Sequence, residues 1–156
     1  MAHFGGRFVG TLSNPNGTAI TRDFVVTNGV TVTKGDFVYY ASGLITNASI
    51  ATQKVIGCAN ETVVGDGTLT CEVIVNPDAL YLVDNDNVST TFAVTHQGTY
   101  FDLTGATGAQ LVDTNTTSTT GQLVCIEYNP QIQPYESDTS MGLFAIAESA
   151  WFGRAA

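Results

Sequence analysis

Charged residues, and basic residues above all, are scarce in this chain of 156 residues. Only 12% of the residues are charged, about half the usual share, and Lys and Arg together number 5 against 14 acidic residues. The basic residues are scattered along the sequence as Arg7, Arg22, Lys34, Lys54 and Arg154. Because no basic stripe can follow a phosphate backbone, nucleic-acid binding is not expected. The formal net charge of −9 also disfavours binding to anionic membranes.

Cysteine is also scarce, and its placement excludes a disulfide framework. Cys58, Cys71 and Cys125 are odd in number, have no metal-ligand spacing, and each lies in an apolar strand-like run. Cysteine in such a run behaves as a small hydrophobic residue, which suits a reducing compartment. No apolar run approaches the roughly 20 residues of a membrane span, and the N-terminus shows no apolar core of signal-peptide length. We therefore expect no membrane partner and no export.

Motifs for catalysis and metal binding are missing as well. The sequence has no Gly-x-Ser-x-Gly nucleophile motif and no P-loop lysine. Asp84 and Asp86 have the spacing that begins a calcium loop, but Ser89 and Thr95 stand where that loop needs a glycine and a glutamate. His96 has no second ligand or catalytic partner placed to act with it. The sequence predicts a protein that is not an enzyme and holds no cofactor or metal.

One sequence pattern occurs twice in the chain. Each copy begins with a Gly-led apolar run, continues with a short Gly-led run, and reaches a third apolar run after a polar stretch rich in Thr and Ser. The three runs are residues 35–40, 43–45 and 54–58 in the first copy, and residues 98–103, 108–112 and 121–125 in the second. Each copy predicts a strand, a turn, a short strand, a polar loop and a buried strand. The repeat indicates a β scaffold whose function lies in a surface.

Turn signals separate further short strand-like runs, so the predicted fold is all-β. Asn28-Gly29 is a strong β-hairpin signal between residues 24–26 and 30–32. Other strand-like runs are residues 70–75, 79–83 and 90–96. Short strands at this spacing are typical of a small β-barrel or a sandwich, built here from two similar strand-turn-strand units. We expect a single β domain over residues 21–156, in which the apolar segment 142–152 is a strand or a short helix.

Both ends of the chain carry candidate contact residues. Over residues 1–20, turn signals separate single large apolar residues, which predicts an extended N-terminal arm that docks on another surface. Near the C-terminus, Trp151-Phe152 is an aromatic pair of the kind that anchors interfaces. The candidate contact residues are Phe4, Arg7, Phe8, Val9, Leu12, Trp151 and Phe152.

The remaining aromatic residues allow two interpretations. Aromatic side chains such as Tyr39, Tyr40, Tyr81, Tyr100 and Phe101 are of the type that stacks on sugars. In strands, however, aromatic residues more often fill the core or pair across strands, and we favour that role. A carbohydrate-binding β-sandwich module therefore stays open as an alternative function.

The repeated pattern resembles the capsid decoration, or cement, proteins of tailed bacteriophages. Those proteins carry a Gly-Asp-x-Val strand, a Gly-led short strand and a Lys/Arg-Val-x-Gly-x-Ala strand. The corresponding residues here are Gly35-Asp36-Phe37-Val38, Gly43-Leu44-Ile45 and Lys54-Val55-Ile56-Gly57-Cys58-Ala59. The second copy, with Gly98, Asp102-Leu103-Thr104, Gln110-Leu111-Val112-Asp113 and Gly121-Gln122-Leu123, is similar to segments of phage virion proteins. The resemblance covers about residues 30–128.

The resemblance implies a small, β-rich, non-enzymatic protein that is made in the host cytoplasm and sits on the outside of an assembled head. Proteins of this family bridge neighbouring major capsid subunits, often as trimers. The expected partners are therefore the major capsid protein and further copies of this chain. Another virion component, such as a head fibre base or a tail-tube protein, stays open as an alternative.

Overall fold

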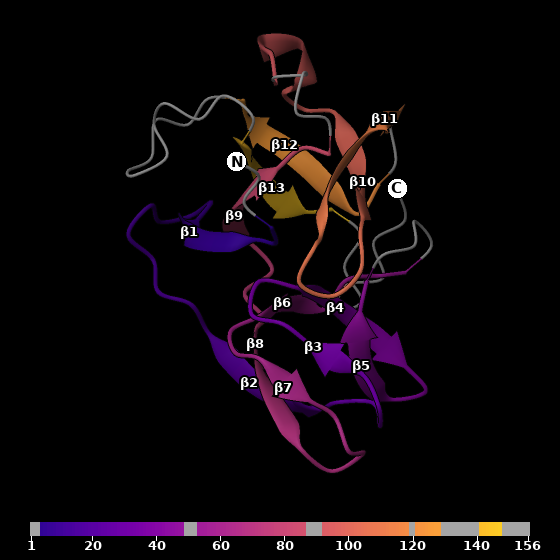
Figure 1. The fold of residues 1–156 in the computed structure, drawn as a ribbon. Helices are drawn as coiled ribbons and strands as arrows, with labels where there is room; N and C mark the ends of the chain where they lie inside the picture. Colours follow the sequence, from indigo (N-terminus) through magenta and orange to yellow (C-terminus); the bar gives the residue numbers. More distant parts are fainter. Residues whose placement is uncertain (1–3, 49–52, 87–91, 119–120, 129–140, 148–156) are drawn as a thin grey trace.

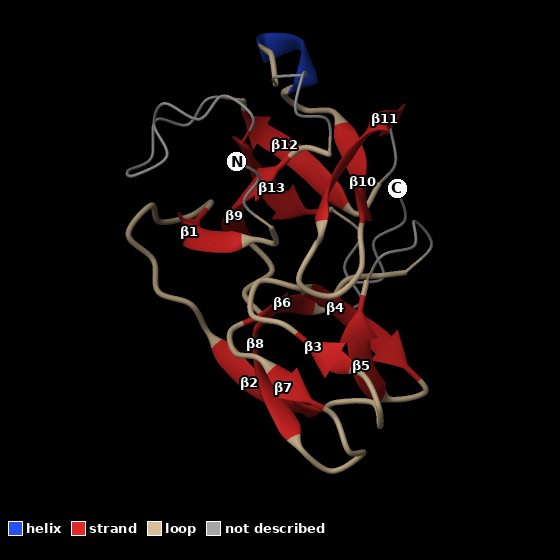
Figure 2. Ribbon diagram, in the orientation of Figure 1, coloured by secondary structure: helices blue, strands red, loops and turns tan. Residues whose placement is uncertain are grey.

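The computed structural model describes residues 4–48, 53–86, 92–118, 121–128 and 141–147, and antiparallel β-sheets make up its framework (Figure 1). Within these residues the only helical element is a single 3₁₀ turn at Val94–His96 (Figure 2). The all-β prediction is confirmed. An isolated β-bridge joins Val26 to Ile45, which lie at the two opposite edges of one sheet. None of the sheets formed by the described residues closes into a barrel. A sandwich therefore fits the structure, and the barrel alternative is not supported.

The described residues form three sheets. The six-stranded sheet, in the upper half of Figure 1, has the order β1 (Arg7–Thr11), β9 (Ala79–Asp84), β13 (Met141–Ile146), β12 (Leu123–Glu127), β10 (Tyr100–Thr104) and β11 (Leu111–Ser118). The five-stranded sheet, in the lower half, has the order β2 (Thr21–Val25), β8 (Thr70–Ile74), β6 (Gly57–Ala59), β4 (Phe37–Ala41) and β5 (Leu44–Asn47). The two-stranded sheet pairs β3 (Thr31–Val32) with β7 (Val63–Val64).

The two copies of the repeated pattern fold alike, each in a different sheet. In the first copy β4 is the middle strand and pairs with β5 and β6. In the second copy β10 is the middle strand and pairs with β11 and β12. Both copies begin at a glycine in the left-handed region, Gly35 with φ of 96° and Gly98 with φ of 81°. Residues with a Cβ rarely adopt that backbone conformation. The required backbone conformation therefore explains why each copy begins with glycine.

The main core lies between the six-stranded and the five-stranded sheets, since strand alternation turns one apolar face of each toward the other. Phe37 and Ile74 come from the five-stranded sheet, and Tyr81, Phe101 and Phe144 from the six-stranded sheet. Edge-to-face contacts join Phe37 to Tyr81 at 5.1 Å between ring centroids, and Phe101 to Phe144 at 5.9 Å. The core role predicted for Tyr81 and Phe101 is confirmed.

The five-stranded sheet is apolar on both faces. Its far face packs with the two-stranded sheet around a second cluster that includes Val32, Val38 and Val73. A third, smaller cluster of Leu82, Met141 and Leu143 lies on the other face of the six-stranded sheet from the main core. The layers therefore run from the two-stranded sheet through the five-stranded sheet to the six-stranded sheet.

The Asn28-Gly29 turn forms, but the β-hairpin predicted around it is wrong. Val30 donates its N–H to the carbonyl of Thr27 at 3.1 Å, and Gly29 has φ of 78°. However, β2 before the turn pairs with β8, whereas β3 after it pairs with β7. The turn thus carries the chain from one sheet into another, and the long-range ladders outweigh the local hairpin signal.

Two other predicted strands have different outcomes. The run at residues 90–96 does not end as a strand, because Val94–His96 form the 3₁₀ turn. Of the apolar segment 142–152, residues 142–146 belong to β13, which lies between β9 and β12 inside the six-stranded sheet. A strand, and not a helix, therefore forms there.

The predicted N-terminal arm is partly built into the fold. Arg7–Thr11 form β1, the edge strand that pairs with β9. Just before it, Gly5 donates its N–H to the carbonyl of Gln110 and Gly6 donates to the carbonyl of Gly35, both at 2.8 Å. The chain then passes through residues 12–20 into β2 of the five-stranded sheet. The first 20 residues therefore link the two sheets, and only part of their side chains is available for external contacts.

Candidate interaction surface

The structure separates the predicted contact residues by exposure. Phe4 and Leu12 are 49% and 56% exposed. Phe8 is half-buried, and its ring lies 6.1 Å from that of Tyr81 against the main core. Val9 is half-buried on the opposite face, against the Leu82, Met141 and Leu143 cluster. Phe8 and Val9 therefore hold β1 in place, and Phe4 and Leu12 are the apolar side chains of this set that face solvent.

The other predicted contact residues do not add to the exposed apolar side chains of the described residues, but one residue that was not predicted does. Arg7 is half-buried, and Trp151 and Phe152 lie outside the described residues. Ile20 was not predicted, although it is 58% exposed. Its N–H donates to Oδ1 of Asn76 and its carbonyl accepts the N–H of Val75, so the backbone that presents it is fixed. The signal that marks Ile20 is its place before β2, in the same N-terminal segment as Phe4 and Leu12.

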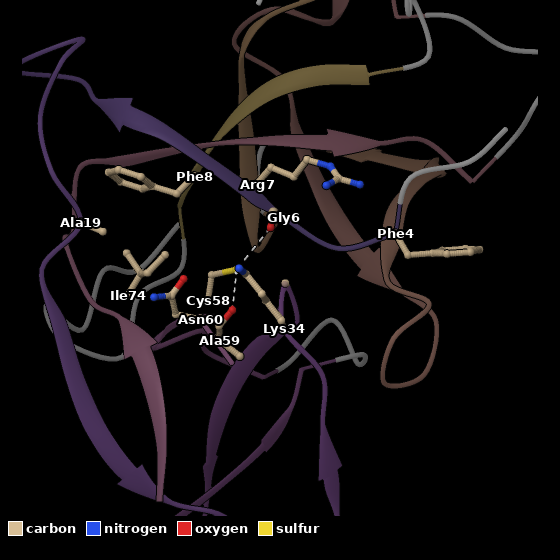
Figure 3. Close-up of a pocket in the computed structure, with 11 residues that line it drawn as sticks. Phe4, Gly6, Arg7, Phe8, Ala19, Lys34, Cys58, Ala59, Asn60 and Ile74 are labelled. Carbon is tan, nitrogen blue, oxygen red and sulfur yellow. Dashed lines mark hydrogen bonds between the residues drawn. The ribbon is translucent and has the colours of Figure 1, made fainter. Parts of the chain in front are cut away.

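A cleft of about 510 Å³ opens between β1 and the five-stranded sheet (Figure 3). Gly6, Arg7 and Phe8 contribute its β1 side, and Lys34, Cys58 and Asn60 lie on the opposite wall. The other lining residues are Phe4, Ala19, Gly35, Ala59 and Ile74. None of these eleven residues is acidic, whereas two are basic. Because acidic residues outnumber basic ones 14 to 5 in the whole chain, the cleft departs from the general charge of the protein.

The three cysteine thiols have structural roles, and their predicted burial is confirmed. Cys58 lines the cleft, and its thiol donates to the carbonyl of Gly6 with 3.7 Å between sulfur and oxygen. Burial raises the pKa of this thiol far above the ordinary value. Burial also raises the pKa values of Cys71 and Cys125 to about 11 each. Since the thiolate is the form that attacks electrophiles and binds metals, these thiols are unreactive near neutral pH.

The remaining polar groups that the sequence singled out support local structure. His96 Nδ1 accepts the N–H of Ala93 at 2.9 Å, and its ring lies edge-on to Phe101 at 5.9 Å. Oδ1 of Asp86 accepts the N–H and the hydroxyl of Thr114 at 3.0 and 2.7 Å. In the part of the chain that the structure describes, no three His, Cys, Asp or Glu side chains are grouped to hold a metal ion.

Asp36, which belongs to the Gly-Asp-Phe-Val segment of the first copy, connects the two copies. Its Oδ2 accepts the N–H of Thr33 at 2.9 Å and the hydroxyl of Thr107 at 2.6 Å. Its Oδ1 accepts the N–H of Gly108 at 2.9 Å. The carboxylate is 1% exposed, so all three bonds form inside the fold. This acidic residue therefore holds a loop of the second copy and is not a surface contact residue.

Comparison with known proteins does not place the chain in a family. No family model, no curated protein and no solved structure matches it. Among the described residues, no helix is both long enough and apolar enough to cross a bilayer. A proposal for the function must therefore rest on the fold, the surface chemistry and the resemblance in the sequence.

Proposed function

We propose that this chain is a structural virion protein that binds the outside of an assembled phage head and bridges neighbouring major capsid subunits. It acts as a homo-oligomer, with the trimer that the resemblance implies, and it has no catalytic role. The observation that carries the proposal is the exposure of Phe4, Leu12 and Ile20, each about half exposed or more, in one N-terminal segment. Large apolar side chains exposed in one segment are typical of a contact surface.

The chemistry of the rest of the protein supports a binding role. The buried thiols, His96 and Asp86 all serve local structure, and charged residues make up only 12% of the chain. A net charge of −9 suits the outside of a shell, away from packaged DNA. On a repeating lattice, several weak contacts act together because each raises the effective concentration for the next.

The alternatives have less support. A sugar-binding platform needs an exposed flat aromatic surface, but Tyr40, 39% exposed, meets Phe24 edge-on at 74° between ring planes. Other aromatic rings, such as those of Phe37 and Phe144, are buried in the main core. A head fibre base or a tail-tube protein shares the all-β character, so lattice position distinguishes these virion roles from head decoration.

The direct test uses heads assembled without this chain. The major capsid protein encoded in the same genome is assembled alone, the purified chain is added, and the particles are imaged by electron cryomicroscopy. We expect added density at regular positions on the outer surface, bridging capsid subunits. Binding only to tail tubes, or no binding to heads at all, would contradict the proposal.

Matched surface variants test whether the N-terminal apolar residues make the contact. The double substitution Leu12→Ser with Ile20→Ser changes residues that are 56% and 58% exposed. The control, Leu69→Ser with Val94→Ser, changes residues that are 50% and 61% exposed elsewhere on the surface. We expect the first pair to raise the dissociation constant for heads about tenfold or more, and the control to change it by less than about twofold. Equal effects would remove the N-terminal segment from the contact.

A further inference from the structure

We propose that the outer edge of β2 receives an extended, basic segment of the major capsid protein, which adds to the five-stranded sheet as a further strand. The inference rests on the proposed function, because the shell protein is the partner. β2 is an edge strand of this sheet, at the lower left of Figure 1, and it directly follows Ile20, one of the exposed residues of the N-terminal segment. The docking edge therefore continues the proposed contact surface.

The backbone of β2 is open on its outer side at Thr21 and Asp23. Val26 donates its N–H to the carbonyl of Leu69 at 2.9 Å, so every second residue before it also directs its polar groups toward β8. The N–H and carbonyl groups of Thr21 and Asp23 therefore point away from β8. Among the described residues, none of these groups has a hydrogen-bond partner. An unpaired strand edge of this kind is a template for a further strand.

Two carboxylates make this edge acidic. Asp23 lies directly opposite Glu72 of β8, and the two side chains project from the same face of the sheet. Oε1 of Glu72 accepts a hydrogen bond from Nδ2 of Asn60 at 2.8 Å, whereas no hydrogen bond or ion pair within the described residues involves the exposed Asp23 carboxylate. Like charges at directly opposite positions destabilise a sheet. A Lys or Arg side chain beside Asp23 would relieve this repulsion, and it would also complement the net charge of −9.

The other face of the same edge carries apolar side chains. By strand alternation this face bears Ile20, Arg22 and Phe24. Ile20 is 58% exposed, and Phe24 is half-buried. Strand addition supplies affinity through main-chain hydrogen bonds, and side chains at alternate positions supply the specificity. The added segment should therefore place a basic residue beside Asp23 and apolar residues on the opposite face.

The sequence of β2 disfavours a second copy of this chain as the occupant. Two antiparallel β2 edges can use all of these open groups only when Thr21 of one copy lies opposite Asp23 of the other, and this register places Arg22 opposite Arg22. A pairing centred on Asp23 places that carboxylate opposite its own counterpart. Like charges directly opposite destabilise a strand pair, and two copies that each carry a net charge of −9 repel one another. A segment of different sequence avoids these conflicts.

Hydrogen exchange tests the strand addition directly in the decorated head. The amides of Thr21 and Asp23, without partners among the described residues, should exchange quickly in the free chain. Their exchange should slow at least about tenfold when the chain is bound to heads. The Val26 amide, already bonded to Leu69, is the control and should change little. Unchanged exchange of Thr21 and Asp23 on heads would overturn the proposal.

Charge reversal at two exposed carboxylates separates this inference from the proposed function. Asp23→Lys should raise the dissociation constant for heads about tenfold or more. Glu127→Lys changes an exposed residue of β12, in the other sheet, and alters the net charge equally, so it should change the dissociation constant by less than about twofold. Thermal melting should show intact folds, because both side chains are exposed. If the unaltered chain does not bind heads, both proposals fail. If it binds and Asp23→Lys binds equally well, only the β2 proposal fails.

Proline at an outward-facing position tests the backbone without changing a charge. Thr21→Pro deletes an N–H that points away from β8, and edge strands tolerate proline where the missing N–H would face solvent. It should raise the dissociation constant for heads about tenfold or more, whereas Thr21→Val, which keeps the N–H, should change it by less than about twofold. Thermal melting shows whether both variants fold. Equal binding by the two folded variants would contradict strand addition at β2, and the exchange measurement decides the question if proline prevents folding.

Discussion

The side-chain amide of Gln110 pairs with the backbone of Phe37 in both directions. Oε1 of Gln110 accepts the N–H of Phe37 at 2.6 Å, and Nε2 donates to the carbonyl of Phe37 at 3.1 Å. The same Nε2 donates to the carbonyl of Ala48 at 3.0 Å. Gln110 precedes β11 in the second copy and Phe37 begins β4 in the first, so one buried side chain joins the two copies where their sheets meet.

Replacing Gln110 with leucine should strongly destabilise the protein. The substitution keeps the volume similar but leaves two buried backbone groups, the N–H of Phe37 and the carbonyl of Ala48, without the partner that Gln110 supplies, whereas the carbonyl of Phe37 keeps the N–H of Ala48. We expect the free energy of unfolding to fall by about 2 kcal/mol or more, because two buried groups lose their partners and each unsatisfied group costs about 1–3 kcal/mol. Urea unfolding followed by far-ultraviolet circular dichroism measures the change.

The control for this variant is Gln97→Leu. Gln97 is exposed, and its one side-chain bond, with the N–H of Tyr128, is long at 3.3 Å. We expect the control to change stability by no more than about 0.5 kcal/mol. A Gln110→Leu variant that is as stable as the control would show that the copies are held together by apolar packing alone.

Replacing Asp36 with alanine should separate the loop at Thr107–Gly108 from the first copy. The carboxylate accepts three hydrogen bonds in a buried setting, and hydrogen bonds to charged groups contribute about 1.5–3 kcal/mol each. We therefore expect a loss of at least about 2 kcal/mol, measured by thermal or urea unfolding. Asp66 also accepts three bonds, from Thr68 and Leu69, but on the surface, so Asp66→Ala should lower the melting temperature much less. Equal losses would indicate that burial of Asp36 adds nothing.

Features that depend on local sequence could be predicted. The Gly-led runs, the buried cysteines and the turn at Asn28-Gly29 follow from patterns of a few residues. The repeat is visible in the sequence for the same reason, since each copy carries its own turn glycines. The strand positions were therefore largely accessible from the sequence.

Features that depend on which strands meet could not be predicted. Nothing in the sequence around residues 24–32 indicates that β2 joins β8 and β3 joins β7, because antiparallel strands with similar apolar residues pair equally well locally. Gln110 and Asp36 resemble ordinary surface residues until the second copy is placed against the first. For the same reason the cleft could not be foreseen, since Lys34 and Phe8 come together only when β1 joins the six-stranded sheet.

Replacing Tyr81 with phenylalanine should stabilise the protein. The Tyr81 hydroxyl is fully buried in the main core, and among the described residues it has no hydrogen-bond partner. Its removal relieves a desolvation cost of about 1 kcal/mol, while the ring contacts with Phe8 and Phe37 remain. Thermal unfolding measures the gain, and Tyr39→Phe, at a half-buried position, should change stability by less than about 0.5 kcal/mol. A loss of stability in Tyr81→Phe would reveal a partner for the hydroxyl, such as a buried water molecule.

Stability should fall at alkaline pH because of the buried thiols. Burial raises the pKa values of Cys71 and Cys125 from 9.0 to about 11 each, so between these values the unfolded chain loses thiol protons that the folded chain keeps. The stabilisation is complete below pH 9 and is lost as the pH rises to about 11. We expect a loss of about 1–2 kcal/mol per thiol over this window.

A double-mutant comparison isolates the thiols from lysines and tyrosines that titrate in the same range. The variant Cys71→Ala with Cys125→Ala is unfolded in urea beside the unaltered chain at a series of pH values, with a reducing agent present. The difference in unfolding free energy should be constant below pH 9 and should shrink between pH 9 and about 11, because only the unaltered chain carries these two groups. A difference that stays constant through this window would mean that both thiols ionise in the folded protein as readily as in the unfolded one, which their burial opposes.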